Sequence, residues 1–135
     1  MAKKLNKEKT KSENELYLNK ISQQDNIHHL HKGLLYEILN KGVGKSPNTN
    51  NVVTVFYKGT LTNGKTFDDN TNQGYPDAFR FSELIEGWQI ALYSMKEGDK
   101  WRIYLPPELG YGSRGTVGIP KNSILIFEIE LVSVV

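Results

Sequence analysis

Hydrophobic and polar positions change their spacing near Gly33. Residues 1–12 are polar and rich in lysine, a composition that predicts disorder. From residue 12 to residue 31, sparse apolar residues in a polar background indicate a weakly amphipathic helix, and Ser12 and Glu15 have the spacing of a capping box at its start. Residues 1–32 are therefore predicted to form a polar, partly helical N-terminal extension.

Beyond Gly33 the pattern is that of β-strands. Apolar residues alternate with polar ones or form short β-branched and aromatic runs, as in a sheet with a buried face. The predicted strands cover residues 33–42, 52–58, 100–105 and 124–135. One short helix is predicted where four apolar residues recur at helical spacing, namely Leu84, Ile85, Trp88 and Leu92.

Asn63-Gly64 separates two strand-like runs. This dipeptide predicts a tight hairpin in which both residues adopt positive φ. Antiparallel hairpins with a single internal helix indicate an α+β fold. We expect residues 33–135 to form one domain, with a curved antiparallel sheet of five or six strands wrapped around the short helix.

Composition and charge exclude several classes of protein. The 135 residues include no cysteine, which excludes a disulfide framework, a thiol nucleophile and a Cys-based zinc site. The net charge of +2 is too small to indicate a nucleic-acid partner. No stretch approaches the roughly 18 apolar residues of a membrane span, and no apolar segment follows the basic N-terminus as in a signal peptide. We therefore expect a cytoplasmic protein that binds neither nucleic acid nor membranes.

Familiar catalytic sets are missing from the predicted domain. All three histidines lie in the extension, at His28, His29 and His31, where a solvated helix face explains them better than a metal site. Without a histidine in the domain, no Ser-His-Asp set can form there. The glycine-rich stretch 110–118 lacks the Lys-Ser/Thr ending of a phosphate loop. We expect no metal and no cofactor.

What remains is a set of aromatic residues at the ends of segments and in loops. Any one of them alone is more often part of a core than of a site. Their position beside polar loops favours a binding role for the set. Its members are Tyr57, Phe67, Phe79, Trp88, Tyr111 and Phe127.

Five segments resemble, in order and spacing, the FKBP-type peptidyl-prolyl isomerases. They are residues 55–68, 84–88, 95–99, 105–112 and 125–131, within a matching region of about 34–135. The resemblance implies a sheet of five or six strands around one helix, in agreement with the pattern above. It also implies an enzyme that rotates X–Pro bonds in an aromatic pocket and assists protein folding.

The resemblance further implies a role for each pocket position. Trp88 is the floor on which the proline ring rests, and Asp68 lies near the twisting amide. The Tyr111 hydroxyl and the Ile85 backbone N–H each donate to a substrate carbonyl. The remaining positions are the walls at Tyr57, Phe67 and Phe127, a further aromatic at Phe79, the rim at Leu84 and the far side of the mouth at Ile119.

Two positions depart from the family pattern. Asp77 stands where an aromatic residue is common, so one wall is predicted to be polar or open, and the loop at 115–120 is one residue shorter than the common form. The implied partners are proline-containing peptides, unfolded or flexible chains, and macrolides such as tacrolimus or rapamycin. The extension is too short and polar for a dimerisation arm, so we expect a monomer. The alternative function is a chaperone module that binds proline segments with little turnover.

Overall fold

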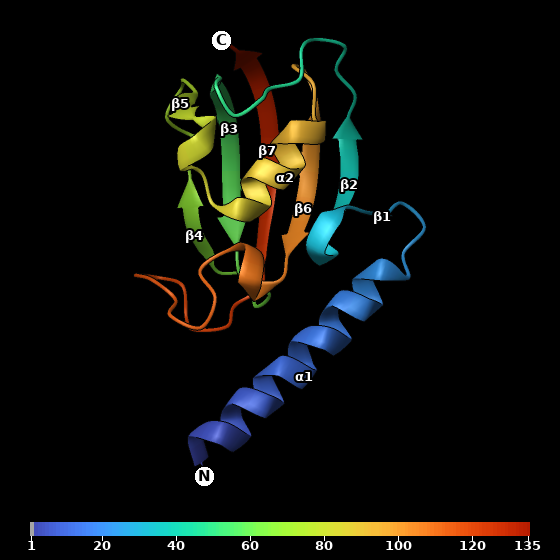
Figure 1. Cartoon of the computed structure of the whole chain (residues 1–135), viewed down its shortest axis with the longest axis vertical. Coiled ribbons are helices and arrows are strands. Elements are labelled where there is room, and N and C mark those ends of the chain that lie inside the picture. Colours follow the sequence, from blue (N-terminus) through green and yellow to red (C-terminus); the bar gives the residue numbers. More distant parts are fainter. Residues whose placement is uncertain (1) are drawn as a thin grey trace.

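The computed structural model describes residues 2–135, and the side chains from residue 8 onward. A curved antiparallel sheet wraps around the short helix α2 (Glu86–Ser94), while the long helix α1 (Ala2–Ser22) projects obliquely from one end of the domain (Figure 1). Three short 3-10 helices, at His31–Gly33, Phe81–Glu83 and Pro107–Leu109, complete the helical elements of the described residues.

Six strands lie side by side across the sheet. In spatial order they are β1 (His28–His29), β2 (Leu35–Asn40), β6 (Lys100–Leu105), β7 (Leu125–Val134), β3 (Val52–Thr60) and β4 (Thr66–Asp69). The seventh strand, β5 (Asp77–Arg80), pairs with the same edge of β3 as β4 does. Two neighbours thus share one edge of β3, which leaves a gap between them.

The core lies between the sheet and α2. Alternation along β7 places Leu125, Phe127, Ile129 and Leu131 inward, as the sequence predicts, and each is at most 4% exposed. Burying an aliphatic side chain of this size contributes about 1.5–3 kcal/mol. The side of helix α2 that carries Trp88 packs against these residues in one core cluster. Its position over the sheet therefore follows from apolar burial on both elements.

The opposite face of the sheet carries a row of alternating charges. Adjacent strands pair Glu37 with Arg102, Arg102 with Glu128, Glu128 with Lys58, and Lys58 with Asp69. The Arg102 guanidinium bonds both flanking carboxylates, at 2.9 and 3.1 Å. A shift of one residue in any pair would turn these charges toward the core, so the row helps to specify the register.

Two carboxylates of the turn before β6 bind backbone N–H groups of other segments. The Glu97 carboxylate accepts hydrogen bonds from the Val134 N–H at the end of β7 and from the Lys45 N–H after β2. Both bonds lower the pKa of Glu97, and the bond from Val134 has the larger effect. The buried Asp99 accepts from Gly42. This turn therefore holds the loop after β2 and the end of the last strand together.

The extension differs from its prediction. Residues 2–12 are helical rather than disordered, because they continue a helix whose later turns pack on the domain, and lysine and glutamate favour helix. The helix ends at Ser22 rather than at His31, since His28 and His29 pair with β2 instead. The predicted capping pair consequently lies inside α1.

Other differences concern short elements. The strands His28–His29 and Asp77–Arg80, neither of which was predicted, bring the sheet to seven strands. In the hairpin after β3, Gly64 has φ +87° but Asn63 is not in the left-handed region. The Gly64 N–H donates to the Leu61 carbonyl, so a turn followed by a bulged glycine replaces the predicted two-residue turn. Leu84 and Ile85 precede α2 rather than lying within it.

None of the helices formed by residues 2–135 combines the length and the apolar character needed to cross a membrane.

Candidate ligand-binding pocket

The pocket is lined by side chains from β3, β4, β5 and β7, from the turn into α2 and from the loop after β6. On β3, its lining residue Tyr57 lies at the break between β4 and β5. Strand β5 pairs with residues 52–55 of β3 and β4 pairs with residues 58–60, so Tyr57 has no strand partner on this side. The side chain of Asn70 takes the place of the missing strand. Its Oδ1 accepts the Tyr57 N–H at 2.7 Å and its Nδ2 donates to the Val55 carbonyl, while the Asn70 N–H donates to the Tyr57 carbonyl. Asn70 therefore fills the break between β4 and β5 and keeps the backbone polar groups of Tyr57 paired.

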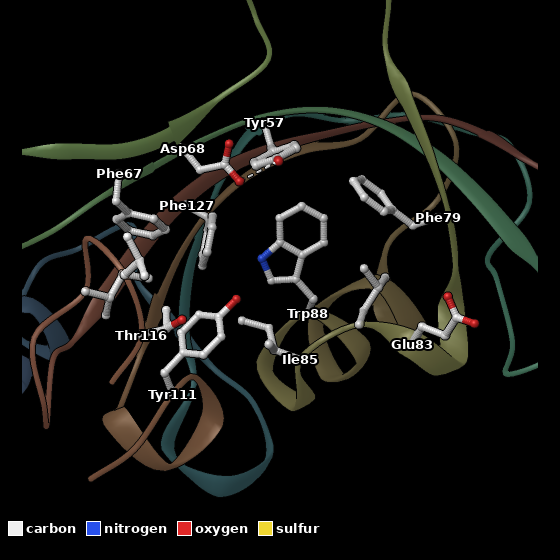
Figure 2. A pocket seen from close by; sticks show the side chains of 13 residues that line it. Tyr57, Phe67, Asp68, Phe79, Glu83, Ile85, Trp88, Tyr111, Thr116 and Phe127 are labelled. Atoms are coloured by element: carbon white, nitrogen blue, oxygen red, sulfur yellow. Dashed lines mark hydrogen bonds between the residues drawn. The ribbon is translucent and has the colours of Figure 1, made fainter. Parts of the chain in front are cut away.

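Aromatic rings form the floor and the walls of this pocket. The Trp88 indole, near the start of α2, is only 4% exposed and lies at the base of a cavity of about 320 Å³. The rings of Tyr57, Phe127 and Phe79 stand at 81°, 90° and 86° to it, with centroids 5.0, 5.2 and 6.1 Å away. Phe67 packs at 87° against Phe127 and extends that wall (Figure 2). The upright rings leave the indole as a flat apolar base.

A short hydrogen bond crosses the top of the pocket. The buried Tyr57 hydroxyl donates to Oδ2 of the exposed Asp68 at 2.6 Å, drawn as the dashed line in Figure 2. Burial, and secondly this bond, raise the pKa of Tyr57 far above its usual value. The hydroxyl therefore remains a donor at neutral pH and holds the carboxylate of Asp68 beside the cavity.

The opposite side of the pocket comes from the long loop after β6. Tyr111 directs its hydroxyl toward the cavity (Figure 2). Thr116, Val117 and Ile119 also line the pocket, and Thr116 and Ile119 exchange two backbone hydrogen bonds that close a small turn. Ile85, the residue just before α2, lines the same side, and no hydrogen bond among the described residues uses its backbone N–H. Two polar donors thus border the aromatic cavity on this side.

The structure gathers all ten predicted site residues around this one cavity. It adds three that the sequence analysis missed, namely Glu83, Thr116 and Val117. None of these types is characteristic of a site, and only the folding of their loops places them here. Asp77 does not line the cavity, because its carboxylate accepts a hydrogen bond from Asn70 at 3.0 Å. The wall at this corner is instead formed by Phe79.

Among the described residues, the buried indole nitrogen of Trp88 has no hydrogen-bond partner. Figure 2 shows it on the side of the ring that faces Phe127 and Tyr111. The perpendicular Phe127 ring offers its π face, which is a weak acceptor.

No cluster of three or more His, Cys, Asp or Glu side chains within the described part of the chain could hold a metal ion.

Comparison with known proteins identifies the family. Residues 44–132 match the family model described as FKBP-type peptidyl-prolyl cis-trans isomerase. The chain belongs to this family. It is 40% identical over 118 residues to the FKBP-type peptidyl-prolyl cis-trans isomerase FkpA of Escherichia coli, which covers 87% of this chain and 44% of that protein. It is 47% identical over 106 residues to the peptidyl-prolyl cis-trans isomerase Mip of Coxiella burnetii, with 78% and 46% covered. The chain therefore spans less than half the length of these two relatives.

Two solved structures share the fold of this chain. The crystal structure of Escherichia coli FkpA has a TM-score of 0.89 at 36% identity, covering 98% of this chain and 63% of that one. A peptidyl-prolyl cis-trans isomerase from Pseudomonas syringae pv. tomato has a TM-score of 0.88 at 34% identity, with 94% of each chain covered. These comparisons confirm the predicted family and fold class.

Proposed function

We propose that this chain is a peptidyl-prolyl cis-trans isomerase that rotates X–Pro bonds in the aromatic pocket and thereby assists protein folding. The observation that carries the proposal is the cavity with an indole floor and perpendicular aromatic walls. A volume of about 320 Å³ is at the lower end of small-molecule sites, which span roughly 300–1,000 Å³. It suits a proline ring and the adjoining peptide group.

The pocket needs no nucleophile for this reaction, because no covalent bond to the substrate is made or broken. The barrier of about 18–20 kcal/mol comes from amide resonance, which is lost when the bond is twisted. A twisted amide has less charge separation than a planar one, so an apolar cavity disfavours it less than water does. Each 1.4 kcal/mol or so of preferential binding to the twisted form accelerates rotation about tenfold.

Each polar group at the border has a proposed role. Trp88 supports the proline ring, and the Tyr111 hydroxyl and the Ile85 N–H donate to the carbonyls of the substrate. Asp68, held by Tyr57, lies at the side where the amide rotates. The remaining aromatic and aliphatic side chains exclude water, and they are Phe67, Phe79, Leu84, Ile119 and Phe127.

The proposed partners are proline-containing peptides and unfolded or flexible chains. Macrolides such as tacrolimus or rapamycin are proposed to fill the same cavity. The two curated relatives cited above carry the word isomerase in their names. A cytoplasmic location and a monomeric state stay predictions.

The two tryptophans offer a matched test. Trp88 and Trp101 are both 4% exposed, but only Trp88 lines the cavity. In a cis-to-trans assay on a proline peptide, Trp88→Leu should lower kcat/KM at least fivefold, and Trp101→Leu should leave it within twofold once folding is verified. Tacrolimus should inhibit the unmodified protein. A flat assay at micromolar protein, together with binding of unfolded chains, would instead establish the chaperone alternative.

A further inference from the structure

One face of α1 lies beside the loop 110–122, which borders the pocket. Asn14, Tyr17, Leu18 and Ile21 are half-buried and follow the i, i+3, i+4, i+7 spacing of one helical face. Leu16, on another face, is 71% exposed. Burial, and secondly the neighbouring Tyr104, raise the pKa of Tyr17. The later turns of α1 therefore lie beside the segment that follows β6, where Asn14 and Leu18 share a cavity with Pro106 and Asn122.

A pair of hydrogen bonds leads from this helix to the pocket. The side-chain amide of Asn14 donates to the backbone carbonyl of Asn122 at 2.8 Å. The Asn122 N–H in turn donates to the carbonyl of Gly112 at 2.8 Å. Gly112 directly follows Tyr111, whose hydroxyl borders the cavity. Two bonds thus connect the helix to Gly112, the chain neighbour of the pocket residue Tyr111.

Ordering the loop 110–122 costs much conformational entropy. Gly112, Gly115, Gly118 and Asn122 all have positive φ, between +56° and +81°. Three of them are glycines, which lose the most conformational entropy when they are fixed. Val117 at the tip is 99% exposed and gains little from packing. A bond from a separate element therefore matters more here than it would in a strand.

We propose that Asn14 is a positioning residue that holds the loop 110–122 so that the Tyr111 hydroxyl points into the pocket. Its effect on catalysis rests on the function proposed above, whereas its effect on the loop does not. Because the loop lines the cavity in ground and transition states alike, losing the bond should raise KM more than it lowers kcat.

The test compares Asn14→Asp with Asn19→Asp. Both changes place the same charge on α1, but residue 19 is exposed. At residue 14 the aspartate replaces an amide donor by a carboxylate that faces a carbonyl oxygen. Hydrogen exchange followed by NMR should show the Asn122 amide exchanging at least fivefold faster in Asn14→Asp only. In the peptide assay this variant should show a KM three to five times higher at nearly unchanged kcat.

Thermal unfolding of both variants separates positioning from general damage, and their midpoints should agree within a few degrees. Equal exchange rates at Asn122 in the two variants would overturn the proposal. Faster exchange with unchanged KM would overturn the link to Tyr111. An inactive unmodified protein would refute the proposed function instead, while the exchange rates would still decide whether Asn14 holds the loop.

Discussion

Replacing Tyr57 with Phe removes one hydroxyl from the pocket and leaves the wall ring in place. That hydroxyl donates to Asp68 at 2.6 Å, a length typical of a bond to an ionised oxygen. Hydrogen bonds to charged groups contribute about 1.5–3 kcal/mol. Because Asp68 is exposed and therefore screened, we expect a contribution at or below the lower end of this range, about 1–1.5 kcal/mol of stability.

Loss of this bond should also affect turnover. A carboxylate that is free to rotate spends less time beside the twisting amide, and a loss of about 1.4 kcal/mol in transition-state binding is a tenfold loss of rate. We therefore expect kcat/KM of Tyr57→Phe to fall three- to tenfold in the proline-peptide assay. The Phe ring keeps the perpendicular contact with Trp88, so the floor should remain intact.

A double-mutant cycle isolates the bond. Tyr57→Phe, Asp68→Ala and the double variant are compared by urea unfolding at pH 7. Burial, and secondly this bond, raise the pKa of Tyr57 in the folded state. The stability that the protonated hydroxyl contributes is therefore fully present below about pH 10, the ordinary pKa of tyrosine. It is lost as the pH rises through the higher pKa of the folded state. The coupling should thus be fully expressed at pH 7. Additivity within about 0.3 kcal/mol would refute the reasoning, because independent sites behave in that way.

Three further predictions address the walls, the outer face and the turn before β6. Gly59→Ala would bring a Cβ within 2.6 Å of the Phe67 ring and 2.8 Å of the Phe127 ring, so the peptide assay should show at least a fivefold loss of kcat/KM. Arg102→Met removes both ion pairs of the charge row and should cost about 1 kcal/mol in low salt and less in 1 M NaCl, by urea unfolding. The pKa of Glu97 is lowered in the folded state, so its ionised carboxylate stabilises the fold above about pH 4.5, the ordinary pKa of glutamate. This contribution is lost as the pH falls through the lower pKa of the folded state. Glu97→Gln should therefore weaken the acid dependence of the urea midpoint.

Each of these has a result that would contradict it. Gly59→Ala with kcat/KM within twofold of the unmodified protein would mean that the wall rings shift without harm. An equal loss for Arg102→Met in low and high salt would assign its effect to packing rather than charge. A Glu97→Gln midpoint that falls by the same amount at pH 7 and pH 4 would rule out the titration of Glu97 as the cause.

Local patterns in the sequence were sufficient for the main strands and for the inward residues of β7. Alternation places every second side chain on one face whatever the strand pairs with, so Leu125, Phe127, Ile129 and Leu131 could be assigned without a structure. The site could be listed because six of its ten members are aromatic, and because the region that holds all ten resembles a known family. The same reasoning failed where structure depends on a partner, as with residues 2–12 and the strand His28–His29.

The chain by itself determined which rings were available and which way most of them point. Only the tertiary structure decided that β4 and β5 would share one edge of β3, that Asn70 would fill the break between them, and that Asp77 would turn to Asn70 rather than to the cavity. It also brought Glu83 and Thr116 to the rim and Asn14 to the back of the loop. The physical reason is distance along the chain: these contacts join segments up to 108 residues apart, and no local periodicity encodes them.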